Sequence, residues 1–415
     1  MEGLLQPPRG TRDLLPPESI LKDRVLQKLK EVFESYGFFP VESPAIELWQ
    51  VLARKAGEEI EKQVYRFKDK SGRDLALRFD LTVPLARIVA SRLDLPLPFK
   101  RYQIGPVWRY EEVRAGKRYR EFWQADCDIV GVSTLEADAE VLALGCDGLE
   151  KLGIKDFYIK LNSRQVLERL LKKLGIPEKL FLPVCRVIDK LDKFPESTVL
   201  NELKELGLKQ PEKLLKLDEG LLEKLKVKAG ELEEIRKLAE EWGFEKRIRI
   251  DLNLARGLDY YTGLIFEFKI TGKEEVGTVV AGGRYDGLIG LFAKKSLPAT
   301  GISFGIDRLL SVLKHQQKTL TQVFVCLVKP ELRSKAVEIC QKFRRAGIPC
   351  ELDLKFRPLS KQLEYADKLG IPWTLFLGPE EIKKGRYKLR NMETGEELQL
   401  DFDTCLKVIK TQKQI

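Results

Sequence analysis

The spacing of apolar residues changes twice along the chain. From about residue 163 to residue 245 the sequence is rich in Leu, Lys and Glu and has helical spacing. One helical face in this block carries Val166, Leu167, Leu170, Leu171 and Leu174. Ser163 is placed to cap this helix, and Gly175 and Pro177 to end it. The sequence on both sides of the block has period 2, which predicts a helical insertion in a larger sheet domain.

Period-2 spacing predicts strands on either side of this block. After it, four apolar residues alternate with polar ones: Ile248, Ile250, Leu252 and Leu254. Before it, the segment 74–80 has three apolar residues that are expected to face the core: Leu75, Leu77 and Phe79. Arg78 and Asp80 then fall on the opposite face. Thr82 is placed to cap a helix whose first turn accepts Pro84.

The second change comes at residues 314–321, a polar connector. Beyond it the pattern alternates between strands and helices, with strands over 323–328, 350–354 and 373–377 and intervening helices that end at Gly347 and Gly370. This order predicts a βαβαβ unit with a mostly parallel sheet.

The segment from 101 to 128 predicts an antiparallel hairpin with a polar tip at 112–117. Arg109 and Glu111 share a face of the first strand, and the second strand has one face with Phe122, Gln124, Asp126 and Asp128. Such a surface offers a guanidinium for phosphate, a ring for a base, and carboxylates and an amide for a polar ligand. The same pattern also fits an amphipathic hairpin whose charged side is solvated.

Three further segments carry polar residues beside predicted strands: 256–263, 281–287 and 301–309. The first contains an arginine and two tyrosines, the second lets backbone approach a neighbour closely, and the third is a strand that runs into a helix. Together with the hairpin they place Arg109, Arg256 and Arg308 beside sheet surfaces. Three arginines without obvious partners suit a polyphosphate ligand.

Composition excludes several reaction classes. The chain has 415 residues, a length typical of two or three domains, and a net charge of +10. Its single histidine, His315, lies in the polar connector, which argues against a Ser-His-Asp hydrolase and a histidine-based zinc site. Neither a P-loop nor a Gly-x-Gly-x-x-Gly motif is present. The seven scattered cysteines indicate reduced thiols in a cytoplasmic protein, and no apolar run is long enough to cross a membrane.

Half of the net charge lies in the last quarter of the chain. Residues 321–415 contain 18 Lys and Arg against 13 Asp and Glu, a net charge of +5, concentrated in the run 383–390. Such a run is usually a solvated face, and it can also be an electrostatic surface for nucleic acid.

These segments resemble the histidyl-tRNA synthetases, a family of class II aminoacyl-tRNA synthetases, over nearly the whole chain. The three class motifs resemble 36–44, 108–128 and 301–308, and the family-specific signatures are similar to 254–261 and 281–287. Asp80 stands where the bacterial pattern usually has Glu, which resembles the archaeal and eukaryotic branch.

The resemblance implies a fold and a domain organisation. An α+β catalytic domain, built on a mostly antiparallel sheet in the class II synthetase fold, would span 1–320 and include the helical insertion at about 163–245. A C-terminal α/β domain over 321–415 would bind the anticodon. The first class motif forms a dimer interface in the family, so a homodimer is expected.

The resemblance also assigns roles in ATP binding and catalysis. Arg109 would bind the α-phosphate and the amino-acid carboxylate, Glu111 would accept from the adenine amino group, and Phe122 would stack on the ring. Arg308 would clamp the γ-phosphate. Arg256 would stabilise charge as the carboxylate attacks phosphorus. No general base is needed, because that carboxylate is already ionised at neutral pH.

For the amino acid, the resemblance implies that Asp80, Thr82 and Gln124 accept from the ammonium group. Asp128 and the Tyr261 hydroxyl would satisfy the imidazole, with Tyr260 alongside. The whole expected histidine site is Asp80, Thr82, Arg109, Gln124, Asp128, Arg256, Tyr260 and Tyr261. Such polar pairing discriminates strongly, because a wrong side chain leaves buried groups unpaired.

The implied reaction joins L-histidine to tRNA in two steps, through histidyl-adenylate and pyrophosphate. ATP with Mg²⁺ is a substrate, and neither a tightly bound cofactor nor a protein-held metal is expected. An alternative is the regulatory subunit of ATP phosphoribosyltransferase, which shares the fold but typically lacks the anticodon domain and catalytic positions. Another class IIa synthetase fits the class motifs but not the segment 256–261.

Overall fold

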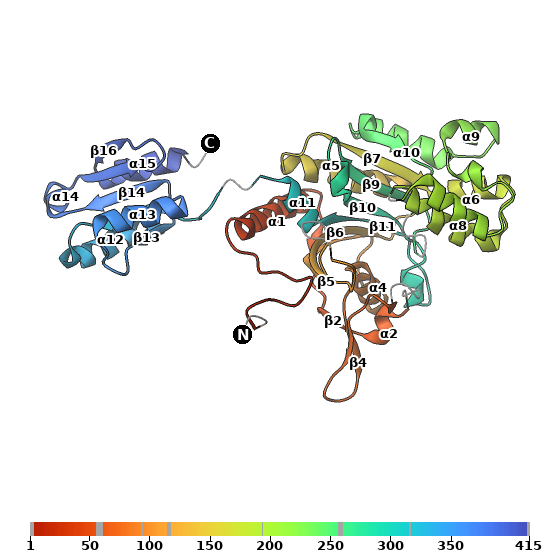
Figure 1. Ribbon diagram of the computed structural model, residues 1–415, viewed down its shortest axis with the longest axis horizontal. Coiled ribbons are helices and arrows are strands. Elements are labelled where there is room, and N and C mark those ends of the chain that lie inside the picture. The colour runs from red at the N-terminus through yellow and green to blue at the C-terminus, as the bar shows by residue number, and fades with distance from the viewer. Residues whose placement is uncertain are drawn as a thin grey trace. The chain divides into compact units, whose positions relative to one another are not determined.

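The structure is a computed structural model that describes residues 4–54, 61–92, 94–113, 118–192, 194–255, 260–314 and 317–412. The chain divides into two compact units. One is formed by Met1–Asp13 and Arg24–Leu313, and the other by Leu14–Asp23 and Lys314–Ile415. Figure 1 shows the elements of both units. No helix in the described parts of the chain is long and apolar enough to cross a membrane.

The first unit is built on an eight-stranded sheet with the order β1-β5-β6-β11-β10-β9-β7-β8. The strands are β1 (Phe39–Pro40), β5 (Phe99–Trp108), β6 (Glu121–Val130), β7 (Phe157–Ser163), β8 (Ile248–Ile250), β9 (Leu264–Ile270), β10 (Thr278–Arg284) and β11 (Ala299–Gly305). The two edge pairs, β1 with β5 and β7 with β8, are parallel, and all five other pairs are antiparallel. The mostly antiparallel sheet is therefore confirmed.

The two faces of this sheet differ because side chains alternate along each strand. One face packs against α1 (Glu18–Ser35) and α5 (Leu135–Lys151). On that side the ring centroid of Phe33 lies 5.6 Å from those of Tyr102 and Phe304. The alternate residues of β5, β6 and β11 point the other way, and many of them are polar. The polar face holds the candidate site.

The helical insertion lies between the parallel strands β7 and β8. It contains α6 (Arg164–Lys173), α7 (Phe181–Ile188), α8 (Glu196–Glu205), α9 (Glu219–Lys224) and α10 (Gly230–Glu241), which gather at one end of the sheet in Figure 1. Ser163 Oγ accepts from Val166 N, and Gly175 takes φ +76° after the helix. Both predicted signals of this helix are confirmed.

A small sheet of β2 (Ile46–Leu48), β4 (Asp74–Leu77) and β3 (Arg66–Lys68) lies beside α2 (Trp49–Leu52) and α4 (Thr82–Ser91). The expected facing of the segment 74–80 is only partly right. Within β4, Ala76 is buried while Leu75 and Leu77 are half-buried, and Arg78 and Asp80, which follow the strand, are buried. Burial of Arg78 is tolerated because its guanidinium donates to Ser43 O at 2.6 Å and Pro106 O at 3.0 Å.

The second unit has a five-stranded sheet in the order β13-β12-β14-β15-β16. Its elements are β12 (Val323–Leu327), α12 (Arg333–Arg345), β13 (Cys350–Leu352), α13 (Leu359–Leu369), β14 (Trp373–Leu377), α14 (Pro379–Lys384), β15 (Tyr387–Asn391), β16 (Glu397–Leu400) and α15 (Phe402–Gln412). The predicted βαβαβ part is parallel, but β15 and β16 add two antiparallel pairs. The parallel βαβαβ unit predicted over 323–377 is therefore confirmed, and the two antiparallel pairs extend its sheet beyond that unit.

Candidate active site

Two adjoining cavities lie on the polar face of the eight-stranded sheet. The first has a volume of about 250 Å³ and the second about 430 Å³. They share seven lining residues: Arg109, Gln124, Tyr260, Tyr261, Ala281, Gly282 and Ser303. The shared lining makes them two compartments of one site.

The β5–β6 hairpin positions most of the polar side chains. Its register pairs Arg101 with Asp128 and Gln103 with Asp126, so these residues share the polar face. Arg109 follows directly after β5, where its backbone N–H donates to Arg120 O at 2.8 Å. The antiparallel hairpin predicted from period-2 spacing is confirmed.

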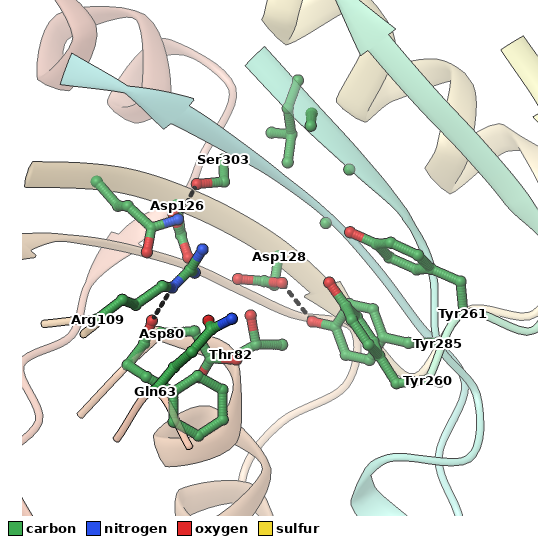
Figure 2. A pocket seen from close by; sticks show the side chains of 16 residues that line it. Gln63, Asp80, Thr82, Arg109, Asp126, Asp128, Tyr260, Tyr261, Tyr285 and Ser303 are labelled. Atoms are coloured by element: carbon green, nitrogen blue, oxygen red, sulfur yellow. Dashed lines mark hydrogen bonds between the residues drawn. The ribbon is translucent and has the colours of Figure 1, made fainter. Parts of the chain in front are cut away.

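Asp128 is held from two sides at the bottom of the first cavity. Arg101, which is fully buried, places Nη2 2.7 Å from Asp128 Oδ2. The Tyr285 hydroxyl donates to Asp128 Oδ1, as Figure 2 shows. This buried ion pair with an added hydrogen bond keeps the carboxylate in one orientation.

Gly301 makes room for this arrangement. It lies opposite Asp128 in the register of β11 and β6, and a Cβ added to it would lie 2.0 Å from Asp128 Oδ1. A glycine is therefore required here by close approach and not by an unusual backbone angle.

Three tyrosines form one wall of the first cavity. The ring centroids of Tyr260 and Tyr261 are 4.1 Å apart, and Tyr285 meets Tyr260 edge-on at 6.2 Å. Burial raises the pKa of all three hydroxyls well above the usual value. They stay protonated at neutral pH and can donate hydrogen bonds.

Asp80 and Thr82 lie at the start of α4 and both line the first cavity. Asp80 Oδ1 accepts from Val83 N at 3.0 Å, whereas the Thr82 side chain does not cap the helix. The expected cap at Thr82 was therefore wrong. Asp80 is placed three residues before an orphan N–H, which is the geometry that favours capping by an acidic side chain.

Arg109 lies at the boundary of the two cavities. Its Nε donates to Phe79 O at 2.9 Å, and its guanidinium carbon lies 5.1 Å from the centroid of Phe122. Within the described residues no carboxylate forms an ion pair with it. The remaining donors of this guanidinium are available for an anionic ligand.

The second cavity is lined by Glu111, Phe122 and Arg308, among others. Glu111 pairs with Arg118 at 3.2 Å, and Arg308 donates to Thr278 O. These residues come from two different elements, the hairpin and α11 (Ile306–Val312).

The N-terminal segment braces this compartment. Arg12 forms a 2.8 Å ion pair with Asp307 Oδ1, and Asp307 Oδ2 accepts from Trp123 N at 2.8 Å. Gly10 O accepts from Arg120 N at 2.8 Å. The segment is thereby tied to α11 and to the return strand of the hairpin.

Ten of the eleven predicted site residues line the two cavities. Asp80, Thr82 and Asp128 line the first; Glu111, Phe122 and Arg308 line the second; Arg109, Gln124, Tyr260 and Tyr261 line both. Arg256 lies outside the described residues, as does His315.

Four polar residues that line the first cavity were not in the predicted set: Gln63, Asp126, Tyr285 and Ser303. Two of them had a sequence signal. Asp126 shares the strand face of Gln124 and Asp128, and Tyr285 belongs to a segment singled out for its glycines. The described residues contain no group of three or more His, Cys, Asp or Glu side chains that could hold a metal ion.

Arg284 has a structural role in the same segment. Its Nε donates to Asp138 at 2.9 Å, and Asp138 accepts from Thr300 Oγ1 at 2.7 Å, all buried. This network joins β10 and β11 to α5 behind the site.

Comparison with known proteins gives one family for nearly the whole chain. The family model for histidyl-tRNA synthetase matches residues 10–309, and that for an anticodon binding domain matches residues 322–412. A histidine–tRNA ligase of Aeropyrum pernix is 41% identical, with 98% of each chain covered, and one of Pyrococcus furiosus is 36% identical, with 97% of this chain and 98% of the relative covered. The crystal structure of histidyl-tRNA synthetase from Nostoc sp. PCC 7120 has a TM-score of 0.87 at 32% identity, covering 98% of this chain and 99% of that one.

Proposed function

Because this chain belongs to the histidyl-tRNA synthetase family and is a histidine–tRNA ligase, we propose that its two cavities bind the two substrates of amino-acid activation. L-histidine occupies the first cavity and ATP the second. The observation that carries the assignment is that all ten described residues of the expected site line these adjoining spaces, with Arg109 at their boundary.

In the first cavity, the imidazole lies against Asp128 and the tyrosines. Asp128 accepts from the ring N–H, and the Tyr261 hydroxyl donates to the other ring nitrogen. Asp80, Thr82 and Gln124 accept from the ammonium group. The substrate carboxylate then points at Arg109, and so at the second cavity.

In the second cavity, Phe122 stacks on the adenine and Glu111 accepts from its amino group. Glu111 pairs with Arg118 through Oε2, and its carboxylate has further acceptor positions for the amino group. Arg109 contacts the α-phosphate and Arg308 the γ-phosphate. The two guanidinium groups hold the triphosphate bent between them.

The chemical step needs alignment and charge stabilisation. The carboxylate of histidine attacks the α-phosphorus, pyrophosphate leaves, and the histidyl-adenylate remains in the site. Arg109 neutralises charge on the α-phosphate, and Arg256 is assigned the stabilisation of charge as the carboxylate attacks phosphorus. The terminal adenosine hydroxyl of tRNA then takes the histidyl group.

Mg²⁺ accompanies ATP in this proposal. It prefers oxygen ligands from one or two carboxylates together with phosphates. Glu267 lines the second cavity and accepts from Thr278 Oγ1 at 2.6 Å. This carboxylate would offer one oxygen to the ion that ATP brings, and the ion would offset the charge of the phosphates.

The remaining assignments concern the whole protein. Catalytic and anticodon-binding domains span 1–320 and 321–415, the protein is a cytoplasmic homodimer, and tRNA binds through the basic C-terminal domain. Such binding weakens steeply with added salt, because counterions are released. A flat salt response would contradict the assignment of the basic surface.

Aminoacylation with labelled histidine and purified tRNA is the direct test. A regulatory subunit of ATP phosphoribosyltransferase would charge no tRNA, and the match to an anticodon binding domain favours the ligase. In histidine-dependent pyrophosphate exchange, Asp128→Ala is expected mainly to raise the KM for histidine, and Arg256→Ala mainly to lower the rate. Wild-type activity of either variant would remove that residue from the site.

A further inference from the structure

Apart from Asp128 Oδ2, which is ion-paired with Arg101, two buried oxygens of the first cavity have no donor among the described residues. Asp126 Oδ1 and Gln124 Oε1 are both buried and accept no hydrogen bond from the described residues. Both side chains line the cavity, and both lie on the same face of β6. A buried acceptor without a donor is costly, so such a pair indicates that a ligand supplies the donors.

The rest of each side chain is held in place. Gln124 Nε2 donates to Ser303 Oγ at 2.7 Å, and the Ser303 hydroxyl is hydrogen-bonded to the Asp126 carboxylate. These hydrogen bonds between β6 and β11 fix which atoms of the two side chains face the cavity. The two free oxygens are therefore oriented acceptors and not mobile surface groups.

The charge of the cavity selects a cationic ligand. Among the described residues that line it, three carboxylates, those of Asp80, Asp126 and Asp128, stand against the one guanidinium of Arg109. Asp128 is already neutralised by Arg101 behind it. An excess of buried negative charge remains around Asp126, which an ammonium group with three N–H donors would offset.

The arrangement in space separates the two ends of the ligand. In Figure 2, Arg109, Asp80 and Asp126 lie on one side of Asp128, and the three tyrosines lie on the other. A zwitterion whose ring lies at the tyrosines therefore presents its ammonium and carboxylate groups to Asp126 and Arg109.

We propose that Asp126 is a further substrate-binding residue, which together with the Gln124 amide oxygen accepts the N–H groups of the amino-acid ammonium. The inference rests on the proposed function of the first cavity and adds a recognition residue to it. Asp126 and Asp80 then both bind the ammonium group, which is therefore held by two carboxylates as well as by neutral acceptors.

Protonation supports this role. Burial raises the pKa of Asp126 to about 7, against the charge of Arg101, and the nearby carboxylates Asp128 and Asp80 raise it further. The positive charge of the buried Arg78 also interacts with the Asp126 carboxylate. An arriving ammonium stabilises the ionised form, so binding near pH 7 releases a proton from Asp126.

The test compares two ligands of the purified full chain: L-histidine and 3-(imidazol-4-yl)propionate, which lacks only the ammonium group. Asp126→Asn is expected to weaken histidine binding at least about tenfold, the loss typical of a charge-assisted hydrogen bond, and to change binding of the analogue less than about twofold. Asp251→Asn, which removes a carboxylate paired with Lys160 away from both cavities, is the matched control and should leave both affinities unchanged.

Equal losses of affinity for the two ligands would overturn the proposal, because they would mean that Asp126 only shapes the cavity. An unchanged affinity for histidine would overturn it as well. If wild type binds no histidine, the proposed function fails instead. If Asp126→Asn does not fold, the proposal is tested on the wild type instead. Calorimetry in buffers of different ionisation enthalpy then measures how many protons each ligand releases on binding. Histidine is expected to release more protons than the analogue at pH 7, and equal release would refute the role of Asp126.

Discussion

Replacing Arg101 by Met tests whether the buried ion pair organises the site. Both partners are buried, with exposed side-chain fractions of 0% and 4%, and their charged atoms are 2.7 Å apart. Arg101 Nη2 also donates to Leu81 O at 2.9 Å, while its Nε and Nη1 find no hydrogen-bond acceptor in the described residues. The buried charge of Arg101 is therefore stabilised mainly by Asp128, and the buried charge of Asp128 is stabilised by Arg101.

The magnitude follows from the uncompensated charge. Removing one partner of a buried pair typically costs about 3–5 kcal/mol, because the other charge stays buried. For a unit of this size, 1 kcal/mol lowers Tm by about 2–4 °C, so Arg101→Met is expected to lower the Tm of this unit by roughly 6–20 °C. Loss of a fixed, ionised Asp128 also costs about 1.5–3 kcal/mol of histidine binding, a rise in KM of roughly 10- to 150-fold.

The assays are thermal unfolding and histidine-dependent pyrophosphate exchange below the Tm of the variant. Arg236→Met is the control, because Arg236 forms an exposed pair with Glu219 at 2.8 Å, with exposed fractions of 42% and 47%. It is expected to shift Tm by less than about 2 °C and to leave KM unchanged. Arg101→Lys keeps the charge and should recover part of both losses. Wild-type stability and KM in Arg101→Met would refute the reasoning.

Three further substitutions test the elements around this pair in pyrophosphate exchange. Tyr285→Phe removes the hydroxyl that donates to Asp128 and should raise the KM for histidine about tenfold, and an unchanged KM would show that the bond is dispensable. Gly301→Ala places a methyl group against Asp128 and should raise the same KM at least about fivefold, whereas a wild-type value would mean that the strand yields. Arg12→Ala breaks the pair with Asp307 and should raise the KM for ATP about two- to fivefold with the histidine KM unchanged; parallel changes in both would indicate a general loss of structure.

The elements that carry the site were predictable where one face of a strand is apolar and the other polar. Period-2 spacing located the β5–β6 hairpin, and helical spacing located α6 together with its cap at Ser163. The antiparallel pair β15–β16 was missed, although Gly395, at φ +76° in the connection between the two strands, is a turn signal.

The site itself was predictable as a set of residue types, but not as a set of partners. Asp126 and Asp128 have the same side chain, lie two residues apart and share one strand face, so the sequence gives no reason to separate them. Their cross-strand neighbours separate them. Asp128 lies between Arg101 on β5 and Gly301 on β11, which supply a cation and the space to reach it.

Asp126 lies instead between Gln103 and Ser303, which supply neutral polar groups and leave one carboxylate oxygen without a donor in the described part of the chain. A shift of the register by two residues would exchange these neighbours without moving any side chain to the other face. The hydrophobic pattern fixes the face, and only the pairing of three strands from distant parts of the chain decides which carboxylate is neutralised by protein and which is left to a ligand. Comparing Asp126→Asn with Arg101→Met therefore tests the register directly, because the first should affect ligand binding alone and the second both binding and stability.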